Sequence, residues 1–173
     1  SQFVLISAYD SDQDVVYAYT YSADGATNWI QAIDPDTREF TKICEPSEAP
    51  RLISYNPIDG KIYGISKTGD FIRLNVQDGS MEVIGSTGFT PSKYKQTMTY
   101  SPIDKKFIWA ALMEDLSACV IAVDPITGEG EKLGDLPLYT EYNILVTTDE
   151  LQDDTKPSAP EILDVDFYQA SFD

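Results

Sequence analysis

The sequence predicts an all-β chain made of β-propeller-like blades, each a sheet of four antiparallel strands. The first observation is a repeat: "SYNPIDGKIYGIS" at residues 54–66 returns as "TYSPIDKKFIWAA" at residues 99–111. The two copies align on Tyr55 and Tyr100, which sets the period at 45 residues, and a weaker copy begins near Tyr9. The second observation is that each copy holds several short strands. A period in the forties with such content is typical of propeller blades.

Each repeat divides into four strands separated by turn residues. The turn from Asn56 to Gly60 favours a hairpin, because proline presets φ and glycine supplies the left-handed position. Lys105 occupies the glycine position in the third repeat, at a predicted cost of about 1 kcal/mol. The second and third strands are apolar on both faces, whereas the fourth strands are polar, which predicts an exposed outer edge. In the middle repeat we expect strands at residues 52–56, 61–66, 71–75 and 81–85.

The repeats predict three blades, at about residues 3–45, 51–88 and 96–136, and one further strand at residues 142–148. Known propellers usually have four or more blades, so three blades and a strand do not close a ring. We therefore expect the chain to be part of a larger propeller in a longer protein. The alternative is self-association, in which another chain completes the ring. A rival fold is an open or sandwich-like β domain built from the same meanders.

The C-terminal part departs from the repeat. Residues 149–160 are charged and then proline-rich, which predicts a linker. Residues 161–173 alternate Ile162, Val165 and Phe167 with polar residues and then stop. We expect them to be the first strand of a truncated second β domain.

Composition excludes several classes of function. The formal net charge of −17 disfavours nucleic acid and anionic membrane surfaces as partners. No apolar run approaches the roughly 20 residues of a membrane span, so we expect no membrane insertion. The absence of histidine excludes Ser-His-Asp and Cys-His catalysis and the usual zinc sites. Cys44 and Cys119 fall at different places in the repeat, which disfavours a disulfide and leaves their redox state open.

The pattern "YNP.DGKIYGI…G.…L.…DG…IG.TG" resembles the propeller-type repeats of secreted and cell-surface bacterial multidomain proteins. The segment "TKPSAPEILDV" is similar to the linker and first strand that introduce fibronectin type III or immunoglobulin-like modules in such proteins. The resemblance implies an extracytoplasmic location, secreted or at the cell surface, with a signal peptide removed before Ser1. It also implies an interaction or carbohydrate-related role. It transfers no catalytic residues, because the matching positions are structural.

Residues that recur with the repeat are assigned to the core, since every blade has the same gap to fill. They are Tyr9, Tyr55, Tyr100, Tyr17 and Tyr63.

Asp10, Asp12 and Asp14 alternate as at the start of a calcium loop. However, Val15 stands where an EF-hand needs glycine, and Tyr21 stands near the position of its glutamate. We therefore interpret this stretch as a hairpin turn and predict no metal site and no cofactor.

Residues that break the repeat are better candidates for ligand binding. Trp29 aligns with Asp70 and Trp109 aligns with Gly64, so neither tryptophan is required by the blade pattern, and each could stack on a ligand or fill a local gap. The connections between blades are expected to share one face, where ligands commonly dock. The predicted ligand-binding residues are Trp29, Phe89, Lys93, Tyr94, Tyr139 and Tyr142.

These observations favour a non-catalytic binding or scaffold module that recognises a glycan or a protein through its inter-blade loops. The alternative is a carbohydrate-active hydrolase or lyase that uses paired carboxylates on the same face. Glu114, Asp115, Glu141 and Asp149 are available there, but no pair stands out and we predict no catalytic residue. A third possibility is an architectural spacer between neighbouring modules.

Overall fold

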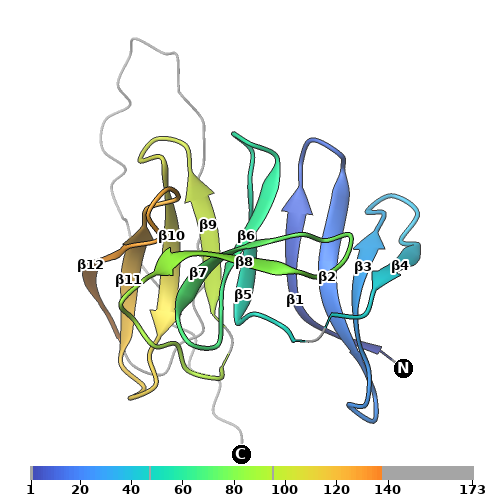
Figure 1. The fold of residues 1–173 in the computed structure, drawn as a ribbon, viewed down its shortest axis with the longest axis horizontal. Helices are drawn as coiled ribbons and strands as arrows, with labels where there is room; N and C mark the ends of the chain where they lie inside the picture. Colours follow the sequence, from blue (N-terminus) through green and yellow to red (C-terminus); the bar gives the residue numbers. More distant parts are fainter. Residues whose placement is uncertain (1, 47, 95, 138–173) are drawn as a thin grey trace, which may run out of the picture.

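The computed structural model describes residues 2–46, 48–94 and 96–137, which form three four-stranded sheets standing side by side (Figure 1). Blade 1 consists of β1 (Gln2–Asp10), β2 (Val15–Ser22), β3 (Asn28–Ile33) and β4 (Phe40–Cys44). Blade 2 consists of β5 (Leu52–Asn56), β6 (Lys61–Ile65), β7 (Asp70–Leu74) and β8 (Met81–Ser86). Blade 3 consists of β9 (Thr97–Ser101), β10 (Lys106–Leu112), β11 (Ala118–Val123) and β12 (Gly130–Leu136).

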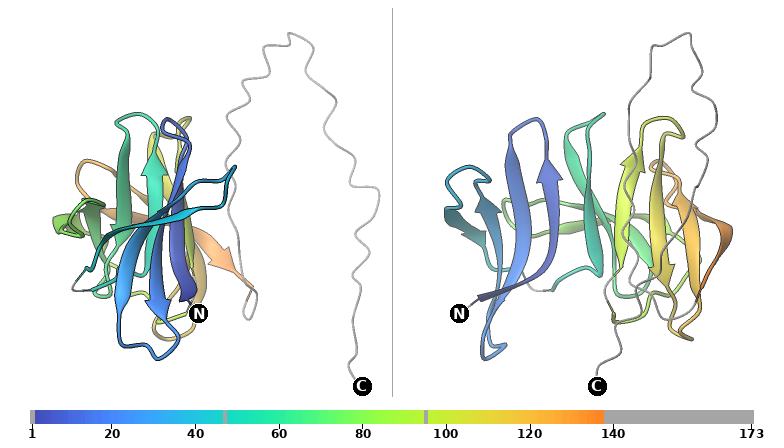
Figure 2. Two further views of the ribbon diagram at one scale, coloured as in Figure 1. Left: turned by 90° about the vertical axis from the view of Figure 1, so that its right-hand side faces the viewer. Right: turned by 180° about the vertical axis from the view of Figure 1, so that it is seen from behind.

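The sheets form a fan of blades, which confirms the predicted fold class. Each is an antiparallel meander with its strands in sequence order. The first strands lie side by side, β1 against β5 and β5 against β9, as Figure 2 also shows from behind. No described residue belongs to a helix that could cross a membrane. The further strand expected at 142–148, the linker at 149–160 and the second domain at 161–173 lie outside the described residues.

The same hairpin chemistry closes the first two strands of every blade. Asp10, Asn56 and Ser101 end the first strands, are buried, and accept hydrogen bonds from backbone N–H groups of the following turn. The turn then passes through a left-handed residue, glycine in blade 2 with φ 67° and Lys105 in blade 3 with φ 53°, as the sequence predicted. Each turn is therefore fixed locally, before any blade packs on another.

The turns between the third and fourth strands also repeat. Asp34, Asn75 and Asp124 each accept backbone N–H hydrogen bonds from residues two or three positions ahead, at 2.8–3.0 Å. These bonds lower the pKa of the Asp34 and Asp124 carboxyls. The turn chemistry thus accounts for the recurrence of Asp or Asn at this position in the sequence.

Two hydrophobic clusters form the core, one at each contact between blades. The first interface, between blades 1 and 2, contains Tyr17, Tyr19, Ile53, Ile62 and Leu74 among its buried residues. The second interface, between blades 2 and 3, is more aromatic. Its large buried residues include Tyr63, Phe71, Tyr100, Phe107 and Trp109. The core of this fold therefore lies between sheets.

The prediction that Tyr9 belongs to the core is wrong. Tyr55 and Tyr100, its equivalents, are each 8% exposed, whereas Tyr9 is 50% exposed and donates a hydrogen bond to Asp14 at 2.7 Å. Tyr55 belongs to the first interface and Tyr100 to the second, each on the side of the preceding blade. Among the described residues, no blade precedes blade 1, so nothing equivalent covers Tyr9.

Cys44 and Cys119 are both free thiols. Cys44 ends β4 in blade 1, and Cys119 lies in β11 of blade 3. Burial raises the pKa of both thiols, which makes them less reactive than an exposed cysteine.

Candidate functional site

The blades present two distinct faces. We call the loop face the one formed by the connections between blades and by the turns between second and third strands. The hairpin face carries the turns between first and second strands and between third and fourth strands. The β1–β2, β5–β6 and β9–β10 turns lie together at the upper edge of Figure 1. The predicted binding residues belong to the loop face.

The connection from β8 to β9 begins at Thr87, which forms hydrogen bonds to both blade 2 and blade 3. Thr87 donates its hydroxyl to the Gly69 carbonyl at 2.6 Å, and the Gly130 N–H donates to the Thr87 carbonyl at 3.1 Å. Blades 2 and 3 are thereby joined through one residue. Phe89 follows directly, and its ring packs against the core of the second interface. The structure thus places Phe89 partly inside the molecule.

The end of this connection is held by Gln96. Its side-chain oxygen accepts the Trp109 indole N–H at 3.1 Å and the Leu112 backbone N–H at 3.0 Å, while its amide nitrogen donates to the Ser92 carbonyl at 3.1 Å. The Ser92 N–H in turn donates to the Leu112 carbonyl at 2.8 Å. Trp109 is fully buried, so it fills a gap in the core and is not available to stack on a ligand.

Between these two anchors, Lys93 and Tyr94 face the solvent. The Tyr94 side chain is 55% exposed, although its backbone N–H is fixed by the Ser92 hydroxyl at 3.2 Å. Lys93 is exposed, with its ammonium 5.7 Å from the centre of the Tyr94 ring. The structure therefore brings Lys93 and Tyr94 together on a braced loop.

Trp29 lies apart from this pair. It belongs to β3 of blade 1, where its indole N–H donates to the Glu45 carboxylate at 3.0 Å and the Lys42 ammonium lies 3.7 Å from its ring. The ring is thus already in contact with a cation and an acceptor from its own blade. Tyr139 and Tyr142 lie outside the described residues.

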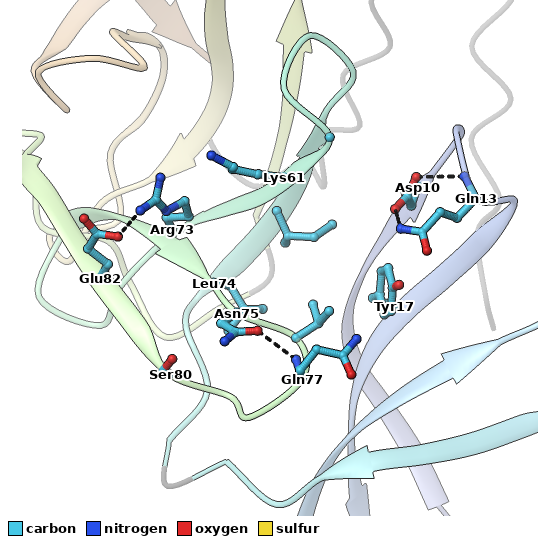
Figure 3. A pocket seen from close by; sticks show the side chains of 13 residues that line it. Asp10, Gln13, Tyr17, Lys61, Arg73, Leu74, Asn75, Gln77, Ser80 and Glu82 are labelled. Carbon is cyan, nitrogen blue, oxygen red and sulfur yellow. Dashed lines mark hydrogen bonds and ion pairs between the residues drawn. The ribbon is translucent and has the colours of Figure 1, made fainter.

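The hairpin face carries a pocket of about 480 Å³ between blades 1 and 2 (Figure 3). Its apolar part is made by Ile62, Leu74 and Val76 of blade 2 and by Tyr17 of blade 1. Polar side chains from three turns surround this part. Figure 3 shows Asp10 and Gln13 on one side, with Lys61 and Arg73 together on the other.

On the blade 1 side, the carboxylate of Asp10 is already occupied. It is 2% exposed and accepts the backbone N–H groups of Asp12 and Gln13 at 3.0 and 3.1 Å, and the Gln13 side-chain amide at 2.8 Å. Burial raises the pKa of the neighbouring Tyr17 hydroxyl, and the Asp10 charge adds to that rise. Asp10 thus serves the turn, as the hairpin interpretation of this stretch predicted. Among the described residues, no group of three or more Cys, Asp and Glu side chains could hold a metal ion.

On the blade 2 side, several hydrogen-bond donors remain available. Glu82 forms an ion pair with Arg73, so its carboxylate is occupied. The Lys61 ammonium has no carboxylate partner among the described residues. Asn75 uses its carbonyl oxygen to accept the Gln77 backbone N–H at 3.0 Å, which leaves its amide N–H₂ group exposed. The side-chain amide of Gln77 is likewise exposed.

The pocket lies at the interface where an aligned core position carries the smaller residue. Ile62 pairs with Leu74 in blade 2, and Phe107 pairs with Val123 at the equivalent place in blade 3. The Phe107 ring centre lies 5.3 Å from that of Tyr63 and 5.1 Å from that of Tyr100. Aromatic rings therefore fill the second interface where the smaller isoleucine leaves space in the first.

The pocket was missed by the sequence analysis, which considered only the loop face. A signal was available, because Ile62 and Phe107 occupy aligned positions in the two best copies of the repeat. A smaller apolar residue at a position that faces the preceding blade indicates unfilled space there. The polar rim gave no comparable signal, because turns in most proteins are rich in the same residues.

No protein-family profile matches the chain, and neither does any curated protein sequence. Solved structures do match its fold. One is the nidogen/laminin complex, with a TM-score of 0.57 and 15% identity over 76% of this chain and 48% of that chain.

A protein of unknown function from Bacteroides thetaiotaomicron matches with a TM-score of 0.54 and 17% identity, over 73% of this chain and 32% of that chain. TolB from Acinetobacter baumannii matches with a TM-score of 0.50 and 17% identity, over 76% and 32%. The nidogen and TolB structures are β-propellers, so the likeness shows a β-propeller-like fold for this chain. The chain spans about a third to a half of the length of these proteins.

Proposed function

We propose that the chain is a non-catalytic binding module of a secreted or cell-surface protein, and that it recognises a glycan or protein partner through its inter-blade loops. The contact would be centred on Tyr94 and Lys93 in the connection between β8 and β9. The chain would supply part of a propeller, and the remaining blades would come from the rest of a longer protein.

One observation carries this proposal: the connection is held by hydrogen bonds near both its ends, yet it presents an exposed aromatic ring. Thr87 holds the start of the connection through its hydroxyl, and the partly buried Gln96 holds its end through three hydrogen bonds. Tyrosine contributes large contact area at a low entropic cost, and a loop fixed before binding pays less ordering entropy when it meets a partner. Tyr94 on this support is therefore suited to anchor an interface.

The alternative of a hydrolase or lyase has less support from the described residues. A glycosidase needs a carboxylic acid whose pKa is raised, next to a second carboxylate. On the loop face, the Asp115 carboxylate accepts both the backbone N–H and the hydroxyl of Ser117, and these bonds lower its pKa. Glu114 is exposed beside Asp115. Glu141 and Asp149, the remaining acids considered there, lie outside the described residues. The described part of the loop face thus favours binding over acid catalysis.

The test is direct binding of the purified chain to a glycan array and to an array of extracellular proteins, followed by titration of each hit. Tyr94→Ala should weaken binding at least about tenfold, the effect expected of a central aromatic anchor. Ile103→Ala is the matched control, because Ile103 is a 74% exposed apolar residue on the hairpin face. Equal binding by both variants would overturn the role of Tyr94. Turnover of a polysaccharide, abolished by replacing one carboxylate, would overturn the non-catalytic assignment.

A further inference from the structure

The pocket on the hairpin face is a second site, independent of the loop face. We propose that it binds an acidic saccharide of one or two sugar units, with the ring hydroxyls on the amide side chains and the sugar carboxylate directed to Lys61. The inference does not depend on what binds Tyr94, because the two sites lie on opposite faces of the blades.

The walls of the pocket are turns that are fixed by hydrogen bonds. The wall formed by the β1–β2 turn is fixed through the three hydrogen bonds to the Asp10 carboxylate. The wall formed by the β7–β8 turn is fixed by the Asn75 oxygen and by the Gly79 N–H, which donates to the Asn75 carbonyl at 2.8 Å. A hollow between two fixed turns needs no large rearrangement to accept a ligand. Its size of about 480 Å³ lies within the range of small-molecule sites, about 300–1,000 Å³.

The amides of the rim favour a polyhydroxylated ligand. Gln13, Asn75 and Gln77 bring planar amides from two blades to one pocket. The Gln13 N–H₂ group already donates to Asp10 and the Asn75 oxygen already accepts the Gln77 backbone N–H. Asn75 therefore offers donors, and Gln77 offers a donor and an acceptor side by side, which matches the neighbouring hydroxyls of a sugar ring. The apolar part formed by Ile62, Leu74 and Val76 would receive the C–H groups of the same ring. A peptide would satisfy these amides less regularly, because its polar groups are spaced along a chain.

The charges favour an acidic sugar over a neutral one. Both carboxylates of the pocket are occupied, Asp10 by its turn and Glu82 by Arg73. The Lys61 ammonium has no such partner among the described residues, and Figure 3 places it beside Arg73 at the blade 2 end. A ligand carboxylate at this end would form a charge-assisted hydrogen bond that the protein itself leaves unmade. The Asp59 carboxylate lies close to Lys61, where it accepts the Lys61 backbone N–H at 3.2 Å and the Tyr63 hydroxyl at 2.6 Å. At physiological salt, screening beyond about 8 Å limits repulsion by more distant acidic residues.

The test is calorimetric titration of the purified chain with four probes. They are glucuronic acid, a disaccharide that contains glucuronic acid, a glucose disaccharide of the same size, and N-acetylglutamate. We expect the acidic disaccharide to bind most tightly. Equal binding of the glucose disaccharide would overturn the role assigned to Lys61. Equal binding of N-acetylglutamate would overturn the sugar assignment, and binding of none of the four would overturn the site.

Substitutions in the pocket test whether the saccharide binds there. Ile62→Phe copies the residue found at the equivalent place in blade 3 and should fill the pocket, so the heat of binding should disappear. Lys61→Gln should weaken the acidic disaccharide about tenfold, the loss expected for one charge-assisted hydrogen bond, and leave the glucose disaccharide unchanged. The matched control is Lys106→Gln, because Lys106 is the equivalent lysine of blade 3 and is already paired with Glu131 at 3.1 Å.

Gln77→Ala provides a second pocket variant should Ile62→Phe disturb folding, because Gln77 is an exposed turn residue. It should weaken both disaccharides. If Ile62→Phe and Gln77→Ala fold and bind as the unchanged chain does, the ligand lies elsewhere and the inference is wrong. Loss of binding in Tyr94→Ala but not in Ile62→Phe would place the saccharide on the loop face and overturn this site, so failure here and failure at the loop face can be told apart.

Discussion

The two interfaces between blades share one backbone plan and differ in how they are filled. Gly64 pairs with Ile72 in blade 2, and Trp109 pairs with Ile121 at the equivalent place in blade 3. Both positions face the preceding blade. The second interface therefore receives an indole where the first receives no side chain at all. Ile62 is likewise smaller than its equivalent Phe107. The first interface therefore carries the smaller side chain at two neighbouring positions.

The turns and the strand register are therefore alike in the repeats, whereas the size of the side chains between neighbouring blades varies. The turns are fixed by hydrogen bonds within five residues, and they tolerate little change. The space between two sheets is adjustable, because a substitution on one blade can be matched by a substitution on the other. A pocket can therefore arise at one interface without any change in the blade itself.

Replacing Trp109 should have the largest effect on stability. Trp109→Ala removes a fully buried indole and leaves the Gln96 oxygen with one partner fewer, so we expect the free energy of unfolding to fall by about 3–5 kcal/mol. Urea unfolding measures this change. The matched control is Trp29→Ala, which removes a partly exposed ring and should cost less than about 1 kcal/mol. Equal losses would contradict the view that the second interface depends on Trp109.

Gly64→Ala tests whether the first interface is loose throughout. A Cβ added at Gly64 would lie 2.4 Å from the backbone carbonyl oxygen of Leu52, so the neighbouring strand must move. We expect a loss of about 1–3 kcal/mol, even though alanine is small and the pocket lies nearby. Urea unfolding of Gly64→Ala beside Ile62→Phe gives the comparison. A stabilised Gly64→Ala variant would show that the unfilled space extends to this position.

The blades were predictable from the sequence because their signals are local. Pro-Ile-Asp turns, a left-handed position at Gly60 or Lys105, and short strands that are apolar on both faces are all visible within a few residues. Tyr9 was assigned wrongly because recurrence shows which way a side chain points and not whether a neighbouring blade covers it. Trp109 was left open for a related reason: its ring is buried in the cluster between blades 2 and 3, and its indole N–H donates to Gln96, which is 13 residues away in the sequence.

The candidate sites were predictable only in part. The pair Lys93 and Tyr94 was proposed because aromatic and basic residues in a connection are unusual in so acidic a chain. That Phe89 packs on the core was not visible, since the sequence does not say which loop side chains turn inward. The pocket depends on the difference between two interfaces, and a repeat alignment that looks for likeness passes over such differences.

Replacing Tyr63 should have the smallest effect on the free energy of unfolding. The pH dependence of that effect distinguishes the two interfaces. Its hydroxyl lies in the filled interface, where burial and a 2.6 Å hydrogen bond to Asp59 raise its pKa from 10.0 to about 12. A raised pKa means that the folded state favours the neutral phenol. This contribution to stability is complete below pH 10 and is lost as the pH rises towards 12. Tyr63→Phe should therefore lose less stability than the unchanged chain between these two values.

Urea unfolding at several alkaline pH values, together with the phenolate absorbance of the folded chain, measures this difference. Tyr17→Phe is the comparison from the first interface, since Tyr17 is the equivalent tyrosine beside the pocket and its pKa is also raised by burial. We expect the Tyr63 substitution to change the alkaline slope more, because Tyr63 has a carboxylate acceptor that holds its proton in addition to burial. An equal change at both positions would mean that burial alone sets these pKa values, and that the two interfaces exclude water to the same degree despite their different filling.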